Sequence, residues 1–590
     1  MSERQVVAAP ARPYVAAAVV AAVVAVFWAP TLWRSDLLNW HIQTSYSAVK
    51  ICGWPAWQEG FTTLCTDDWY YRVLERRAIK LPSTAWTSLA AHRWGLAPLF
   101  YALPWALHAA AAATVASIAK KITGETGLAV LAGLLFGLHP ATAEVLVSGQ
   151  FIQLVFGALF SALALRLALS GSRALVAAAL ALACFCDVMF VVTPLIVLAW
   201  VDDRRAWRPL CVTTAGLGAA LHAGHSWLYP ELLSHHMTIA TMSLGDRLLR
   251  GLVVEPVLAL RRLLLLWSPE SGPWYMNAPV GEFSGLGPLA PAPLLGLLGL
   301  LGACAWIGRR QLPTLARLFI LPVALLLADV CLRAALSDVL SSRWSGLRNV
   351  YVPAAFLALM IAWCLRRPGL RAWVAPAVGV VALSASAYLS WTLAQRTWVR
   401  MADDRRALNA GVEKLRPLAL PAGSTVYLFG VADSRLFSIW QASVRDELGE
   451  VRFAVVTRDD GEGTGSSFRR VGPRELEVTI DPDRVDFIRP EAQPAWAGPM
   501  DPAEGLALYI RRGGQLNAWP IFDRGALDGQ WVSLPGTGGG AVRVDSLAKD
   551  DRVRLRLRAA LDLDDPRTIV LFERAEGWVR IDPGLETQSF

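Results

Sequence analysis

The chain has few charged residues. Asp, Glu, Lys and Arg make up 18% of its 590 residues, below the roughly 25% of soluble domains. Apolar residues make up 54%, and the mean hydropathy is +0.40. These values exclude an ordinary soluble enzyme as the whole chain. They predict a membrane protein with room for a helical bundle and one soluble domain.

Several short enzyme motifs are also missing. The sequence contains no Walker phosphate-binding loop, no GxSxG nucleophile elbow and no CxxC pair. The sequence predicts no particular metal site, because the adjacent His235 and His236 are not spaced for one helical face. The question of whether the protein uses a divalent metal is left open at this point. Cysteines are few, but Cys52 and Cys65 share a polar loop and either form a disulfide or stay reduced.

Long apolar runs are abundant, and each run of about 20 residues can cross a bilayer as a helix. The net charge of +8 lies largely between these runs, which indicates membrane topology rather than a nucleic-acid partner. We expect about eleven transmembrane helices, at residues 14–32, 97–119, 126–146, 151–170, 173–186, 188–201, 208–228, 288–307, 313–334, 350–365 and 372–394.

The basic residues between the runs predict the orientation. With a cytoplasmic N-terminus, the cytoplasmic connections carry Lys120, Lys121, Arg173, Arg204, Arg205, Arg309, Arg310, Arg366, Arg367 and Arg371. The opposite loops, above all 33–96 and 229–287, are long and rich in Trp, Tyr and Pro. The first run is too long for a removed signal peptide, so we expect a retained helix.

The composition changes near residue 395. Segments 424–430, 451–457 and 552–558 are strand-like, and 433–448 has helical spacing. We therefore predict a transmembrane domain over 1–395 and an extracytoplasmic α/β or mostly-β domain over 396–590.

Four short segments then stand out in the membrane domain. They are PSTAWTSL at 82–89 with WGLAP at 94–98 and His108, LHPATAE at 138–144, the stretch 187–202 around Thr193 and Pro194, and RNVYVP at 348–353. Ionisable residues at membrane depth mark functional sites by default.

In this order, the four segments resemble the GT-C superfamily of membrane glycosyltransferases. The similarity is to bacterial relatives of protein O-mannosyltransferases and of the transmembrane-and-tetratricopeptide-repeat mannosyltransferases, and it covers roughly 14–395. It implies a polyprenyl-phosphate sugar lipid as donor and a protein or glycan acceptor. The repeat array of that family is replaced here by the domain after residue 400.

Glycosyl transfer needs a carboxylate that accepts the proton of the acceptor hydroxyl. Asp36, immediately beyond the first helix, is our first choice, by its position in the family. Asp67 and Asp68 are a rival pair for substrate or metal, although a solvated turn or a helix start explains them more simply. His139 and Glu144 are further candidate catalytic residues, which could position the acceptor or fix the catalytic loop. Pro140 favours a helix start between them, and the alternative for both is a buried polar pair that orients the loop.

The departing phosphate needs cations. Arg348 is the first candidate, because arginine binds phosphate through a bidentate fork, and Tyr351 lies one turn further on as a donor. Lys80 and Arg343 are alternatives. An interfacial arginine that reaches lipid headgroups is the competing interpretation of Arg348.

Together these features predict a glycosyltransferase of a bacterial inner membrane that acts on the extracytoplasmic side. A flippase of lipid-linked glycan and a non-catalytic membrane scaffold remain alternatives.

Overall fold

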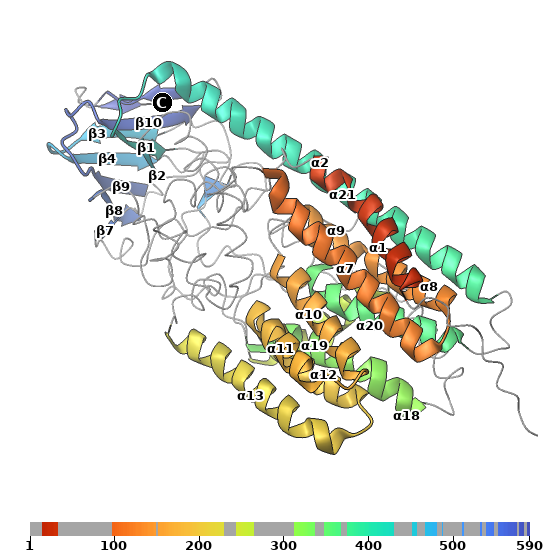
Figure 1. Cartoon of the computed structure of the whole chain (residues 1–590). Coiled ribbons are helices and arrows are strands. Elements are labelled where there is room, and N and C mark those ends of the chain that lie inside the picture. The colour runs from red at the N-terminus through yellow and green to blue at the C-terminus, as the bar shows by residue number, and fades with distance from the viewer. Residues whose placement is uncertain are drawn as a thin grey trace, which may run out of the picture.

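The chain folds into a helical bundle joined by one long helix to a region of β-sheet (Figure 1). This computed structural model describes residues 14–33, 97–148, 152–228, 244–264, 312–336, 347–366, 374–429, 451–456, 466–480, 486–487, 510–511, 531–533, 539–547, 553–574, 577–582 and 587–589.

The apolar runs form helices. In a helix the backbone N–H and C=O groups bond to each other, which a bilayer requires because it offers no water as a partner. Their bounds are α1 Val15–Trp28, α2 Pro30–Trp33, α7 Ala97–Thr123, α8 Thr126–Gly137, α9 Pro140–Ser148, α10 Ile152–Ala168, α11 Arg173–Cys186, η3 Val188–Val192, α12 Thr193–Trp200, α13 Arg204–Leu228, α15 Leu244–Leu249, η4 Arg250–Val254, α16 Glu255–Leu263, α18 Leu312–Leu315, η7 Ala316–Ile320, α19 Leu321–Leu336, η9 Leu347–Val350, α20 Tyr351–Leu365, α21 Val374–Leu415 and η11 Arg416–Leu418.

The expected eleven spans are not supported by the described residues. Three helical stretches there are long and apolar enough to cross a membrane, namely Val15–Trp33, Tyr101–Thr123 and Arg348–Leu365. A fourth is reached if Thr126–Gly137 and Pro140–Val147, bent by 51°, count as one broken span. Other predicted spans form helices that are shorter or less apolar, and the predicted span 288–307 lies outside the described residues.

Helices α1 and α8 approach closely through small residues. A Cβ built on Gly133 would lie 2.8 Å from both Val20 methyls, and one on Gly137 would lie 2.3 Å from Val24 Cγ2. Val20 and Val24 are buried there. Glycines four residues apart are a common device for tight helix packing in membranes, and this one seats α1 against the bundle.

Helix α21 leads from the bundle to the sheet region (Figure 1). It continues through the predicted boundary at residue 395 as far as Leu415, and the first strand begins at Thr425. The strands are β1 Thr425–Phe429, β2 Arg452–Val455, β3 Ser466–Arg470, β4 Glu475–Ile480, β5 Asp486–Phe487, β6 Ile510–Arg511, β7 Val532–Ser533, β8 Ala541–Leu547, β9 Val553–Arg558, β10 Thr568–Arg574, β11 Gly577–Arg580 and β12 Gln588–Ser589.

Two main sheets build this region. One has the order β11-β10-β1-β2, in which β1 runs parallel to both β10 and β2. The other is antiparallel, with the order β12-β3-β4-β9-β8-β7. The sheets meet through aromatic rings, since Phe468 lies edge-on to Phe429 at 5.2 Å and to Phe572 at 5.5 Å. Strands at all three predicted segments are thus confirmed; the predicted helix 433–448 lies outside the described residues.

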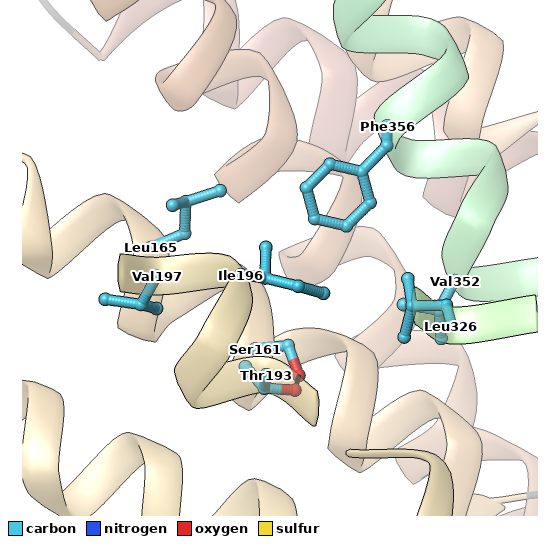
Figure 2. A pocket seen from close by; sticks show the side chains of 8 residues that line it. All are labelled: Ser161, Leu165, Thr193, Ile196, Val197, Leu326, Val352 and Phe356. Carbon is cyan, nitrogen blue, oxygen red and sulfur yellow. Dashed lines mark hydrogen bonds between the residues drawn. The ribbon is translucent and has the colours of Figure 1, made fainter. Parts of the chain in front are cut away.

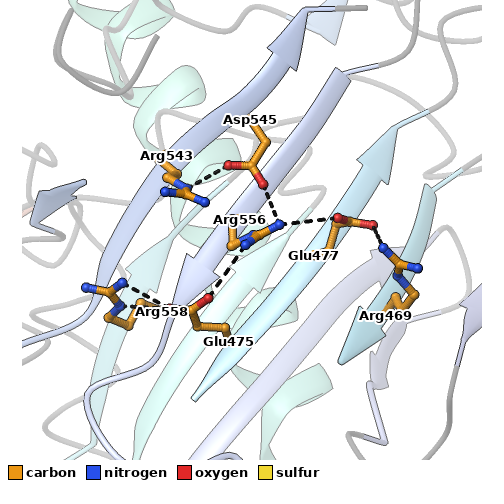
Figure 3. Close-up of polar contacts among 7 residues, drawn as sticks. All are labelled: Arg469, Glu475, Glu477, Arg543, Asp545, Arg556 and Arg558. Carbon is orange, nitrogen blue, oxygen red and sulfur yellow. Dashed lines mark hydrogen bonds and ion pairs between the residues drawn. The ribbon is translucent and has the colours of Figure 1, made fainter. Parts of the chain in front are cut away.

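The six-stranded sheet carries alternating side chains. Leu555 and Leu557 are buried, whereas Arg556 and Arg558 face the other way and pair with carboxylates of the neighbouring strands (Figure 3). Arg558 Nη2 lies 2.9 Å from Glu475 Oε1. Such cross-strand ion pairs fix the register of the sheet, and we assign them no catalytic role.

Candidate functional site

The helix break between α8 and α9 gathers polar groups inside the apolar bundle. It frees the carbonyls of Gly137 and Leu138 from helical partners, and three side chains from distant helices bind them. Trp28 Nε1 donates to Gly137 O at 2.9 Å, His108 Nε2 lies 3.0 Å from the same oxygen, and Ser390 Oγ donates to Leu138 O at 2.7 Å. Because buried carbonyls require such donors, helices α1, α7 and α21 together hold the break in place.

His139 caps the helix that follows the break. The backbone N–H of Ala141 donates to His139 Nδ1 at 3.2 Å, so the ring proton lies on Nε2, which donates to Leu263 O at 3.1 Å. Both ring nitrogens are therefore engaged, one with α9 and one with the end of α16. Pro140 is the first residue of α9, as expected. The geometry favours an orienting role for His139 over direct contact with substrate.

Glu144 and Arg348, two of the predicted site residues, lie together. The Arg348 backbone N–H donates to Glu144 Oε2 at 2.9 Å, and Arg348 Nη1 lies 3.7 Å from Glu144 Oε1. The Glu144 side chain is 3% exposed and that of Arg348 17%. A buried carboxylate thus fixes both the backbone and the guanidinium of Arg348, whose side chain stays partly exposed.

Tyr351 extends this arrangement to α7. Its hydroxyl lies 2.7 Å from His108 Nδ1. Since His108 Nε2 faces a carbonyl and must carry the proton, Tyr351 donates to Nδ1. Phe136 packs against both rings, with centroids 5.5 Å from His108 and 5.3 Å from Tyr351.

These contacts close a ring through five elements, namely α9, η9, α20, α7 and α8. From Glu144 the ring passes to Arg348, then along the chain to Tyr351, across to His108 and back to the break at Gly137. We call these five residues the polar ring. It unites His108, the LHPATAE segment and the RNVYVP segment, although Glu144 and Arg348 are 204 residues apart.

The fourth singled-out segment borders an apolar pocket beside the ring. Thr193, at the start of α12, lines it with Ser161 of α10, Leu326 of α19, and Val352 and Phe356 of α20 (Figure 2). The pocket is partly open and small, with room for about one water molecule. Ser161 Oγ and Thr193 Oγ1 bond to each other at 3.0 Å, so the lining presents apolar surface.

Other predicted site residues lie outside the described residues, and the structure does not test them. They are Asp36, Asp67, Asp68, Lys80 and Arg343, together with the cysteine pair Cys52 and Cys65.

A metal centre finds no support among the described residues, where no group of three His, Cys, Asp or Glu side chains comes together. His222 Nε2 instead lies 2.9 Å from Cys184 O and ties α13 to α11.

Sequence reasoning did not assign site roles to Trp28, His108 or Ser390. Each is a hydrogen-bonding residue within an otherwise apolar helix, and that signal was present in the sequence. Their partners could not be read from it, because backbone carbonyls become acceptors only where a helix breaks.

Comparisons with known proteins found no matching family model, no matching curated protein and no matching solved structure.

Proposed function

We propose that the chain is an integral-membrane glycosyltransferase that transfers a sugar from a polyprenyl-phosphate donor to an acceptor hydroxyl on the extracytoplasmic side of a bacterial inner membrane. The observation that supports this most is the polar ring. Three of the four segments that resemble GT-C enzymes meet in it, and it holds an arginine at the end of a membrane-length helix.

The chemistry assigns a role to each group. The acceptor oxygen forms a bond to the anomeric carbon while the bond between that carbon and the donor phosphate breaks. Asp36 takes the hydroxyl proton as general base. The polyprenyl phosphate leaves with the bonding electrons, and the Arg348 guanidinium stabilises its negative charge.

The rest of the ring positions Arg348. Glu144 holds its backbone N–H and guanidinium, and Tyr351, bonded to His108, anchors the start of α20 one turn away. Lys80 and Arg343 remain candidates for additional phosphate contacts, and Asp67 and Asp68 for substrate.

The proposed orientation has support from the basic helix ends. Arg366, at the end of α20, donates from Nη1 to Ile122 O at 3.3 Å, beside Lys120 and Lys121 of α7. Two connections that the positive-inside rule assigns to the cytoplasm thus lie together. The sheet region would then lie outside, at the far end of α21, where it can contact the acceptor.

A flippase of lipid-linked glycan is the second candidate. The broken span formed by α8 and α9, bent by 51°, favours it, because discontinuous helices often surround transported substrates. A flippase would move the lipid without releasing polyprenyl phosphate, so chemical turnover separates the two functions.

The test is sugar transfer by purified protein in nanodiscs, supplied with a panel of polyprenyl-phosphate sugars and candidate acceptors. Wild type should release polyprenyl phosphate, and Asp36→Asn should lower that rate by about 10²-fold or more, the usual contribution of a general base. Asp203→Asn is the matched control, since Asp203 only accepts the Ala206 backbone N–H at the start of α13. Equal rates for Asp36→Asn and wild type would contradict the assigned base, and lipid movement without release would contradict the transferase.

A further inference from the structure

One face of the six-stranded sheet is charged on four neighbouring strands. The opposite face buries Phe468, Leu555 and Leu557. Side chains alternate between the two faces of a strand, so the outward face gathers five arginines and three carboxylates. We call this set the arginine face: Arg469, Arg543, Arg554, Arg556, Arg558, Glu475, Glu477 and Asp545. Figure 3 shows all of them except Arg554.

The carboxylates hold the central arginines in place. Arg556 Nη2 lies 2.8 Å from Asp545 Oδ2 and 3.7 Å from Glu477 Oε2. Glu477 also accepts a hydrogen bond from Arg469 Nη2 at 2.7 Å, and the Arg469 side chain stays 56% exposed. A guanidinium that is already held loses little conformational entropy when it binds an anion.

Arg558 is the best-placed arginine for a ligand. Its Nε and Nη2 both donate to Glu475 Oε1, at 3.1 and 2.9 Å, and its guanidinium lies 3.9 Å from the centroid of the Trp531 ring. The side chain is nevertheless 43% exposed, and its Nη1 makes no hydrogen bond within the described part of the chain. Arg558 therefore presents a fixed donor to solvent.

We propose that the arginine face binds a glycan chain that carries carboxylate groups, and that this chain is the acceptor of the sugar. Its role as acceptor rests on the proposed function, whereas the binding itself depends only on the face. Arginine pairs with a carboxylate through charge-assisted and often bidentate hydrogen bonds. Uronate groups therefore complement Arg554 and Arg558, which lie on the same side of β9.

The mixture of charges favours a sugar acid over other polyanions. A polyphosphate chain presents anions alone, and the three carboxylates of the face would repel it. A sugar acid carries hydroxyl groups as well, and these donate to the carboxylate oxygens that have spare lone pairs. The excess of arginine then binds the carboxylates of the ligand.

The size and position of the face match a long chain. The row from Trp531, next to β7, to Arg469 on β3 crosses five strands about 4.8 Å apart, which gives a length of about 19 Å. The sheet region lies at the far end of α21 from the bundle (Figure 1). A polymer held there can still extend its end to the membrane domain, whereas a single sugar could not.

The experiment measures the binding of an oligogalacturonate to the full-length protein in nanodiscs by isothermal titration calorimetry. We expect saturable binding that disappears when the same oligomer is methyl-esterified, because esterification removes the negative charge of each carboxylate and leaves the sugar chain. Equal affinity for the methyl ester, or for inorganic polyphosphate, would overturn the proposal.

Substitutions locate the binding site. Arg558→Gln should weaken binding by about tenfold or more, the usual effect of losing a hydrogen bond to a charged group. Arg554→Gln should also weaken it, and the fold should persist, since Arg554 is exposed and enters no ion pair among the described residues. Arg580→Gln is the matched control, because Arg580 is an exposed arginine of β11 in the other sheet. Wild-type affinity in both Arg558→Gln and Arg554→Gln would overturn the assignment.

The outcome also separates this inference from the proposed function. If the arginine face binds oligogalacturonate but the protein transfers no sugar from any donor, the binding site is supported and the transferase is contradicted. If sugar transfer occurs while oligogalacturonate does not bind, the transferase is supported and this inference is overturned.

Discussion

Glu144→Ala is expected to destabilise the protein by roughly 3–5 kcal/mol, the usual effect of removing one partner from a buried ion pair. The carboxylate is 3% exposed and binds Arg348 through both the backbone N–H and the guanidinium. Its loss leaves a partly buried N–H without its acceptor and frees the arginine to move. Thermal unfolding in nanodiscs measures the stability, and polyprenyl phosphate release measures the activity.

Glu144→Gln separates charge from hydrogen bonding. The amide oxygen can still accept the Arg348 N–H, so the stability loss should be smaller than in Glu144→Ala. The Arg348 guanidinium nevertheless loses its counter-charge in Glu144→Gln, so the KM for the donor should differ from that of wild type. Asp202→Ala, in the turn before α13, is the control, because Asp202 is exposed. If Glu144→Ala is as stable as this control, the Glu144–Arg348 pair does not stabilise the fold.

Gly157→Ala is the second substitution with a large expected effect. A Cβ on Gly157 would lie 2.0 Å from Phe190 Cε2, and Phe190 is fully buried in η3. Overpacking of this kind costs about 1–3 kcal/mol. It would displace η3 and α12, so the protein should unfold at a lower temperature than wild type.

A double-mutant cycle tests the cause. Phe190→Leu gives the new methyl group room, and the two substitutions together should cost less than their sum, with a coupling of about 0.5–3 kcal/mol. Gly216→Ala on α13 is the matched control, since no heavy atom lies within 4 Å of its added Cβ, and it should be neutral or stabilising. Additive effects of Gly157→Ala and Phe190→Leu would contradict the packing seen here.

Much of the secondary structure was predictable because it depends on local pattern. Apolar runs without charges predicted helices such as α7 and α20, and alternating residues predicted β1 and β9. The number of spans was overestimated because a run such as 188–201 meets a composition criterion yet folds as a short 3-10 helix followed by the eight-residue helix α12.

The candidate site was predictable only in part. Residue type and the family resemblance selected Glu144, Arg348 and Tyr351, and the fold brings all three into the polar ring. The hydrogen bond from Tyr351 to His108 spans 243 residues, and no local pattern encodes such a contact. The role of His139 also depended on structure, since the Ala141 N–H at Nδ1 and the Leu263 carbonyl at Nε2 show which ring nitrogen is the donor.

The central claim is that Arg348 binds the donor phosphate during sugar transfer. The most direct measurement is polyprenyl phosphate release at varied donor concentration by wild type and Arg348→Lys in nanodiscs. Lysine retains the charge beside Glu144 but lacks the bidentate fork, so the fold should persist while the donor KM rises by about tenfold or more and kcat falls. Arg166→Lys on α10, where Arg166 Nε bonds Ser117 Oγ at 2.8 Å, should match wild type. An unchanged donor KM and kcat in Arg348→Lys would contradict the account.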